Sequence, residues 1–157
     1  MNSDDGTKKA LARAYRLLAI RNRSEAEMRQ SLQRAGFDAG CIDEAVSRLR
    51  DQGLINDRNF AEEWTRGRMA SRPRGRRLIE RELRTKGVSA EDATAATSDV
   101  DDDEVARTLA IRRAQALRDV DRQTFIRRLS NYLLARGFSR ETVVRAMGHA
   151  LSMRDDS

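Results

Sequence analysis

The sequence predicts an all-α protein, built as an elongated, curved array of three tandem three-helix units with about nine helices in all. Apolar residues recur at the three- and four-residue spacing of amphipathic helices, and runs that alternate as β-strands do are absent. One pattern of residues occurs three times along the 157-residue chain. Hydrophobic residues make up only 39% of the chain and charged residues 36%, so three thin cores in series are expected in place of one large core.

The repeated pattern is a glycine with apolar residues eight and four positions before it, followed by an apolar residue and a capping residue. The apolar pair forms one face of a helix, and the glycine supplies the left-handed backbone conformation that ends the helix. The Asp or Ser that follows accepts hydrogen bonds from free N–H groups at the start of the next helix. The three copies are Met28, Leu32, Gly36, Phe37 and Asp38, then Ile79, Leu83, Gly87, Val88 and Ser89, and then Leu129, Leu133, Gly137, Phe138 and Ser139.

The first unit is expected over residues 9–55, and flexible tails are expected over residues 1–8 and 154–157. Ser24 and Glu27 are spaced as a capping box, so they predict the start of the second helix of this unit. The apolar positions of the first and third helices are Leu11, Tyr15, Leu18, Ile42, Ala45, Val46 and Leu49.

The second unit is expected over residues 56–98 and the third over residues 99–153. Asn56 or Asp57 begins the first helix of the second unit, because both residue types cap helices. An acidic run that ends at Glu104 begins the third unit, since carboxylates stabilise a helix N-terminus. The apolar positions that follow are Phe60, Trp64, Ile79, Leu83, Val105, Leu109, Ile111, Phe125, Leu129, Leu133, Val143, Val144, Met147 and Leu151.

A longer motif joins the first two units and is similar to one found in a known family. It reads Leu49-x-x-x-Gly53-Leu54-Ile55-Asn56-Asp57-x-x-Phe60-Ala61-x-x-Trp64. With the glycine-ended repeats, it makes the chain resemble the RecX family of RecA regulatory proteins. Asn56 is a departure, since the family more often has aspartate there, but both residues cap helices and the expected fold is unchanged.

The resemblance implies both a fold and a function. It implies a curved array of three-helix units that lies in the groove of a RecA–DNA filament and inhibits recombinase, ATPase and coprotease activities. The partners would be the RecA filament and single-stranded or duplex DNA, in homologous recombination, DNA repair and the SOS response. We also expect a cytoplasmic monomer with no membrane partner, because no apolar run approaches the length of a membrane span.

Basic residues suggest where such partners would bind. The formal net charge is +6, and all but three of the 31 Lys and Arg residues are arginine, whose planar fork matches phosphate and carboxylate oxygens. Two basic clusters stand out along the chain. The candidate binding residues are Arg66, Arg68, Arg72, Arg74, Arg76, Arg77, Arg81, Arg84 and Lys86 in the first cluster, and Arg112, Arg113, Arg127 and Arg128 in the second.

Part of the first cluster is expected to form one face of a helix. At 100° per residue, a narrow stripe would contain Arg74, Arg77, Arg81 and Arg84, with Ile79 and Leu83 on the opposite, buried side. A helix with a core face and a cationic face suits docking onto phosphates or an acidic groove. The alternative is a solvated face that only aids solubility. Pro73 and Gly75 are expected to break the chain before this stripe.

No residues that perform catalysis or bind a metal or cofactor are expected. Cys41 and His149 are the only members of their residue types, and no glycine-rich phosphate loop occurs. Phe60 and Trp64, one helical turn apart, are expected in the core rather than as a base-stacking pair. We therefore predict a binding protein and no enzyme. The competing function is a DNA-binding regulator of the helix-turn-helix kind, which would read bases with one helix.

Overall fold

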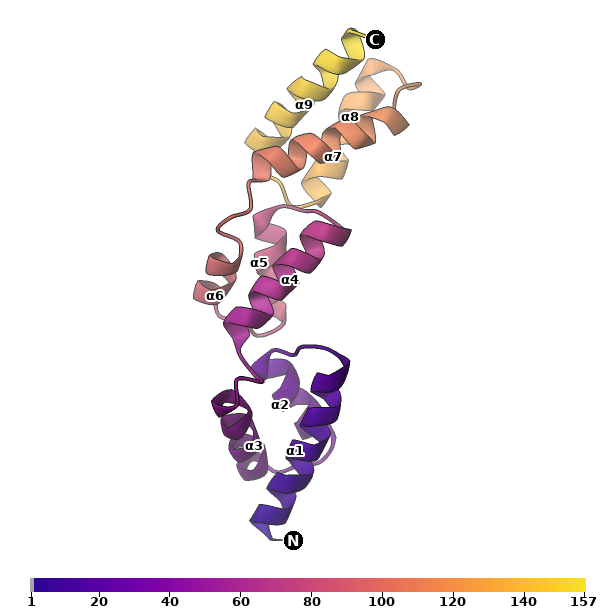
Figure 1. Ribbon diagram of the computed structural model, residues 1–157. Coiled ribbons are helices and arrows are strands. Elements are labelled where there is room, and N and C mark those ends of the chain that lie inside the picture. Colours follow the sequence, from indigo (N-terminus) through magenta and orange to yellow (C-terminus); the bar gives the residue numbers. More distant parts are fainter. Residues whose placement is uncertain (1) are drawn as a thin grey trace. The chain divides into compact units, whose positions relative to one another are not determined.

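The computed structural model describes residues 2–157, and this part of the chain contains nine α-helices and no β-strand. The helices form three consecutive groups of three, so the predicted class of tandem three-helix units is confirmed (Figure 1). We call these groups the first, second and third domains. Their helices are α1 (Ser3–Ile20), α2 (Glu25–Arg34) and α3 (Ala39–Asp51), then α4 (Asp57–Ser71), α5 (Arg76–Thr85) and α6 (Ala90–Ala96), and then α7 (Asp102–Ala116), α8 (Arg122–Ala135) and α9 (Arg140–Asp155).

The chain packs into two compact units, whose borders fall inside the second domain. The first unit consists of Met1–Trp64 and Leu83–Ala96, and the second of Thr65–Glu82 and Thr97–Ser157. The first compact unit therefore contains the whole first domain and α6, and the second compact unit contains the whole third domain. Helices α4 and α5 contribute residues to both units.

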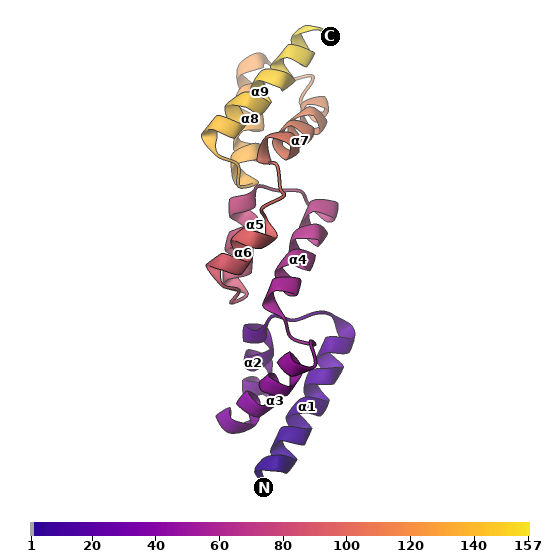
Figure 2. The same ribbon diagram turned by 60° about the vertical axis from the view of Figure 1, so that its left-hand side comes forward.

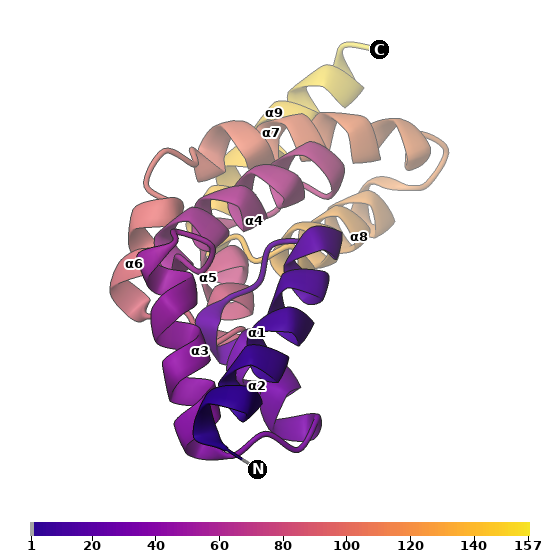
Figure 3. The ribbon, with the colours of Figure 1, turned by 60° about the horizontal axis from the view of Figure 1, so that its bottom comes forward.

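The core of the first domain lies among α1, α2 and α3, which are seen from their lower end in Figure 3. Met28, Leu32, Val46 and Leu49 are completely buried there, and Ile55 extends the cluster beyond α3. The repeat predicted Met28 and Leu32 as an (i, i+4) core pair, and the capping box at Ser24 forms as expected.

The expected flexible tail over residues 1–8 differs from the structure, in which α1 begins at Ser3. Gly6 and Thr7 are buried, and a Cβ added at Gly6 would lie 2.7 Å from the Sγ of Cys41. The absence of a side chain at Gly6 thus lets α3 approach this end of α1. Ion pairs of Asp4 with Lys8 and of Asp5 with Lys9 lie on exposed positions of the same helix.

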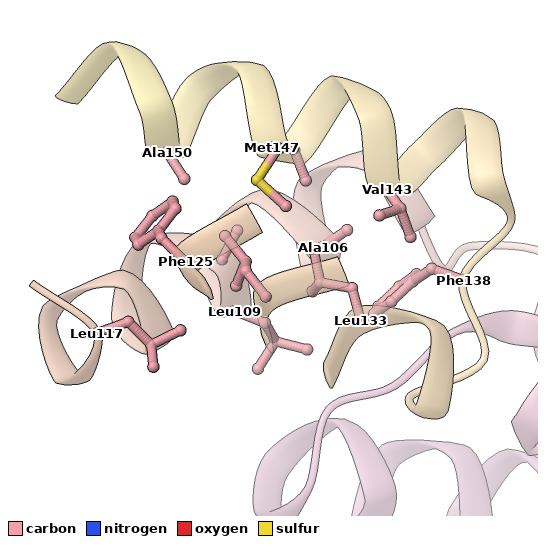
Figure 4. Packing of buried hydrophobic residues seen from close by; sticks show 12 residues of the cluster. Ala106, Leu109, Leu117, Phe125, Leu133, Phe138, Val143, Met147 and Ala150 are labelled. Carbon is pink, nitrogen blue, oxygen red and sulfur yellow. The ribbon is translucent and has the colours of Figure 1, made fainter. Parts of the chain in front are cut away.

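The core of the third domain lies among α7, α8 and α9, whose packing is shown in Figure 4. Phe125 and Leu133 of α8 point toward Leu109 of α7 and Met147 of α9, and all four are buried. The residue after the glycine stop, Phe138, folds back into the same cluster. The predicted apolar positions of the third-domain helices are thus buried or half-buried, with the exception of Val144 on α9.

The predicted glycine stops are confirmed by their backbone conformation. Gly36, Gly87 and Gly137 have φ angles of +92°, +82° and +88°, in the left-handed region that side chains disfavour. The N–H of the next residue donates to the carbonyl of the repeated leucine in each case, as from Val88 to Leu83 at 3.0 Å. The same three-residue device therefore ends α2, α5 and α8.

Candidate basic interaction surface

Helix α5 presents three exposed arginines on the side away from its buried residues. Arg77, Arg81 and Arg84 lie within a sector of about 60° around the helix axis. Ile79 and Leu83, on the opposite side, are both 0% exposed. Neither Arg77 nor Arg84 forms an ion pair with any residue between 2 and 157. We call Arg77, Arg81 and Arg84 the α5 arginine stripe.

Arg74 does not belong to this stripe, so that part of the sequence prediction was wrong. Helix α5 begins at Arg76, after the break at Pro73 and Gly75, and the helical angle assumed for Arg74 does not apply. Its side chain is only 12% exposed and lies 3.0 Å from the Glu82 carboxylate. Burial lowers the pKa of the Arg74 guanidinium, which the charge of Glu82 opposes.

Two further residues of the first cluster take part in packing within the protein. Arg68 lies 3.1 Å from the same Glu82 carboxylate, which therefore faces two guanidinium groups. Lys86 lies 3.5 Å from Glu27, and its ammonium group stands 5.2 Å from the centre of the Trp64 ring. Arg66 and Arg72 are exposed, whereas Arg76 is half-buried. Five of the nine candidates are thus exposed, whereas Arg68, Arg74 and Lys86 lie against acidic side chains of the protein.

Replacing Glu82 with Ala is expected to destabilise the protein by about 1.5–3 kcal/mol, since hydrogen bonds to charged groups contribute on this scale. The change leaves the partly buried guanidiniums of Arg68 and Arg74 without this carboxylate. Chemical denaturation would measure the loss, with the exposed Glu62→Ala as the control. Equal stability of the two variants would contradict a structural role for these ion pairs.

The second cluster lies on the third domain. Arg112 and Arg113 on α7, and Arg127 and Arg128 on α8, are all exposed. Arg112 borders a pocket of about 410 Å³ that Pro73, Val100 and Leu109 also line. All four arginines belong to the second compact unit, together with Arg77 and Arg81.

One basic residue of this region was missed by the sequence analysis. This residue is Arg136, whose guanidinium lies 5.1 Å from the centre of the Tyr132 ring. The guanidinium of Arg113 lies at the same distance from that ring. Arg136 also lies close enough to Arg74 to lower the pKa of that residue, after the larger effects of burial, Glu82 and Arg68. Because Arg136 is isolated in the sequence from both clusters, only the fold reveals this grouping.

The aromatic pair Phe60 and Trp64 and the single cysteine, Cys41, take part in packing within the protein. Phe60 and Trp64 stack with ring centres 6.1 Å apart, and Phe60 is buried, as expected of core residues. Cys41 is 4% exposed, and burial raises the pKa of its thiol. Across residues 2–157, no group of three His, Cys, Asp or Glu side chains is arranged to hold a metal ion, and no helix is both long and apolar enough to span a bilayer.

Comparisons with known proteins agree with this architecture. Family models of the first, second and third RecX three-helix domains match residues 10–49, 56–96 and 101–147. The regulatory protein RecX of Amycolatopsis mediterranei is 39% identical over 134 residues, which cover 83% of this chain and 77% of that protein. The regulatory protein RecX of Streptomyces coelicolor is 35% identical over 150 residues, or 94% of this chain and 80% of that protein. The crystal structure of RecX from Lactobacillus salivarius matches with a TM-score of 0.84 at 25% identity, covering 94% of this chain and 97% of that one.

Residues 2–157 form an all-helical protein of three tandem three-helix domains, and its curated relatives are regulatory proteins. Both the domain matches and the identity to curated relatives extend over most of the chain. The chain belongs to the RecX family.

Proposed function

We propose that this protein binds the RecA–DNA filament as a monomer and inhibits its recombinase, ATPase and coprotease activities. Membership of the RecX family supports this assignment. The observation that carries the proposal is the α5 arginine stripe, which combines three exposed cations with a fully buried opposite face. Such a helix can present charge to a partner without loss of its own packing.

We further propose that exposed arginines of the two clusters form the binding surface. Arg66, Arg72 and the α5 arginine stripe would act together with Arg112, Arg113, Arg127 and Arg128. Guanidinium groups match the oxygen atoms of DNA phosphates and of RecA carboxylates equally well, so both are suitable contacts. By contrast, Arg68, Arg74 and Lys86 would act mainly through the ion pairs that they form within the protein.

ATP turnover by RecA on single-stranded DNA tests the proposal directly. We expect the purified protein to lower steady-state turnover in a concentration-dependent manner, because a bound regulator in the filament groove opposes its active state. RecA filaments that receive the same concentration of an unrelated basic protein provide the control for charge alone. ATP turnover that is unchanged at saturating protein would contradict the proposed function.

A further inference from the structure

The N-terminus of α2 docks onto the turn that ends α5, within the first compact unit (Figure 2). The hydroxyl of Ser24 donates to the carbonyl of Lys86 at 2.6 Å, and Ser24 is 0% exposed. The backbone N–H of Glu25 donates to the carboxylate of Asp57, the first residue of α4, at 2.9 Å. A Cβ added at Gly87 would lie 2.3 Å from the Cβ of Ala26. The first and second domains therefore meet at a closely packed polar junction.

The same arrangement occurs between the second and third domains, within the second compact unit. The N–H of Gly75 donates to the carbonyl of Arg136 at 2.8 Å. The N–H of Arg76 donates to the carboxylate of Asp102, the first residue of α7, at 3.0 Å. A Cβ added at Gly137 would lie 2.5 Å from the Cβ of Leu78. Here the N-terminus of α5 docks onto the turn that ends α8.

The two junctions use corresponding residues of the repeat. Ser24 and Gly75 each directly precede a middle helix, and the acceptor carbonyls of Lys86 and Arg136 each directly precede a glycine stop. The first helices of all three domains also contain a buried alanine at equivalent positions. The residue four positions before this alanine is aspartate in the second and third domains and glycine in the first. It is Asp57 before Ala61 and Asp102 before Ala106, but Gly6 before Ala10.

Within residues 2–157, the first domain has neither the aspartate nor a helix packed against its glycine stop. Nothing lies within 4 Å of a Cβ added at Gly36, whereas Gly87 and Gly137 meet a neighbouring helix. The aspartate thus occurs together with a glycine stop that packs against a helix of the preceding domain, at both places where one domain follows another. This coincidence argues that the aspartates serve the junction and not the helices α4 and α7 themselves. The side chains of Asn56 and Asp101 instead cap these two helices.

Helix ends explain why an aspartate suits this position. The first N–H groups of a helix have no partner inside the helix, and they need an acceptor when a neighbouring domain excludes water. Asp57 and Asp102 supply that acceptor from the next domain. Burial raises the pKa of both carboxyl groups, with the backbone hydrogen bond opposing it. The hydrogen bonds place a carboxylate oxygen as the acceptor at both junctions.

We propose that Asp57 and Asp102 are positioning residues, each of which fixes one domain against the next by capping the middle helix of the preceding domain. Each junction thereby holds together segments of two successive domains inside one compact unit. The proposal concerns residues outside both basic clusters. Only its effect on filament inhibition rests on the proposed function.

Amide hydrogen exchange of alanine and asparagine variants tests the positioning role at single residues. Asp57→Ala should speed exchange of the Glu25 amide by about tenfold or more and leave the Arg76 amide unchanged, while Asp102→Ala should do the reverse. The asparagine variants should retain protection close to that of the wild type, because the amide oxygen also accepts a hydrogen bond. The exposed Asp51→Ala is the control. Unchanged exchange in the alanine variants, or equal acceleration at both amides, would overturn the proposal.

Glycine variants test the packing of the same junctions. Gly36→Ala, Gly87→Ala and Gly137→Ala all place a side chain at a positive φ angle, so they share one backbone penalty. Only the latter two also collide with a neighbouring helix. We expect Gly36→Ala to lower the melting midpoint by roughly 2–4 °C, and the other two to lower it at least twice as far. Equal shifts for the three variants would show that the junctions do not hold the domains.

The functional consequence is tested with the variant that carries both Asp57→Ala and Asp102→Ala. It keeps every basic residue, yet it should need a severalfold higher concentration to inhibit ATP turnover by RecA filaments. Inhibition at wild-type concentrations would show that junction geometry does not matter for the filament. If the wild-type protein itself fails to inhibit, the proposed function fails, while the exchange and melting results still decide the positioning role.

Discussion

Replacing Arg77, Arg81 and Arg84 together with glutamate is expected to abolish inhibition of the RecA filament while the helical content stays unchanged. The three side chains are exposed and face away from Ile79 and Leu83, so the core does not depend on them. Charge reversal replaces attraction to a polyanion with repulsion, which affects binding far more than neutralisation does. Circular dichroism and ATP turnover, measured on the same preparation, separate folding from function.

Net charge alone has to be excluded as the cause. Reversal of Arg13, Arg16 and Arg34, which are exposed residues of the first domain outside both basic clusters, changes the net charge by the same amount. This control variant should still inhibit the filament. If the folded α5 variant inhibits RecA at wild-type concentrations, the α5 arginine stripe is only a solvated face. The arginines of the third domain, Arg112 to Arg128, would then be the better candidates.

Leu32→Ala is expected to destabilise the protein by roughly 2–5 kcal/mol, the range for removing a buried leucine side chain from a core. Leu32 is 0% exposed and packs with Met28, Val46 and Leu49 in the first domain. Its counterparts Leu83 and Leu133 are also 0% exposed. The loss should be large because a small three-helix core has few other residues to fill the space.

Denaturant unfolding of Leu32→Ala and Leu134→Ala provides a matched comparison. Leu134 also lies on a helix, so both substitutions change helix propensity alike, but it is 43% exposed. We expect Leu134→Ala to lower the free energy of unfolding much less than Leu32→Ala does. Similar losses from the two substitutions would mean that the repeated leucine does not hold the core.

The helices and their ends could be predicted because their signals are local in the sequence. The repeated leucine lies four residues before the glycine stop, so the two act within about one helical turn. The structure shows both in Leu83, which is buried, and Gly87, which has a positive φ angle. The apolar pattern was less reliable at the edges of helix faces. Val144 was assigned to the core of α9 but is 70% exposed, whereas Tyr15 is 40% exposed and donates its hydroxyl hydrogen to Gln52.

The surface was harder to predict because long-range contacts decide which charges are available. Arg74 belongs to the densest basic run, yet it faces Glu82 once the chain breaks before Arg76. Arg136 joins Tyr132 and Arg113 although no nearby run of basic residues marks it in the sequence. Asp57 begins α4 as expected, but no local pattern indicates that its carboxylate also caps α2 in the preceding domain. None of these pairings has a fixed spacing that a sequence pattern could reveal.

The salt dependence of filament binding tests the central claim most directly. Fluorescence anisotropy would give the affinity of the wild-type protein and of the triple glutamate variant for RecA–DNA filaments over a series of salt concentrations. We expect the logarithm of the wild-type affinity to fall steeply and linearly with the logarithm of salt concentration, because binding to a polyanion releases counterions. The triple variant should bind more weakly and with a much shallower slope. Equal affinities and equal slopes for the two proteins would contradict the assignment of the α5 arginine stripe as the binding surface.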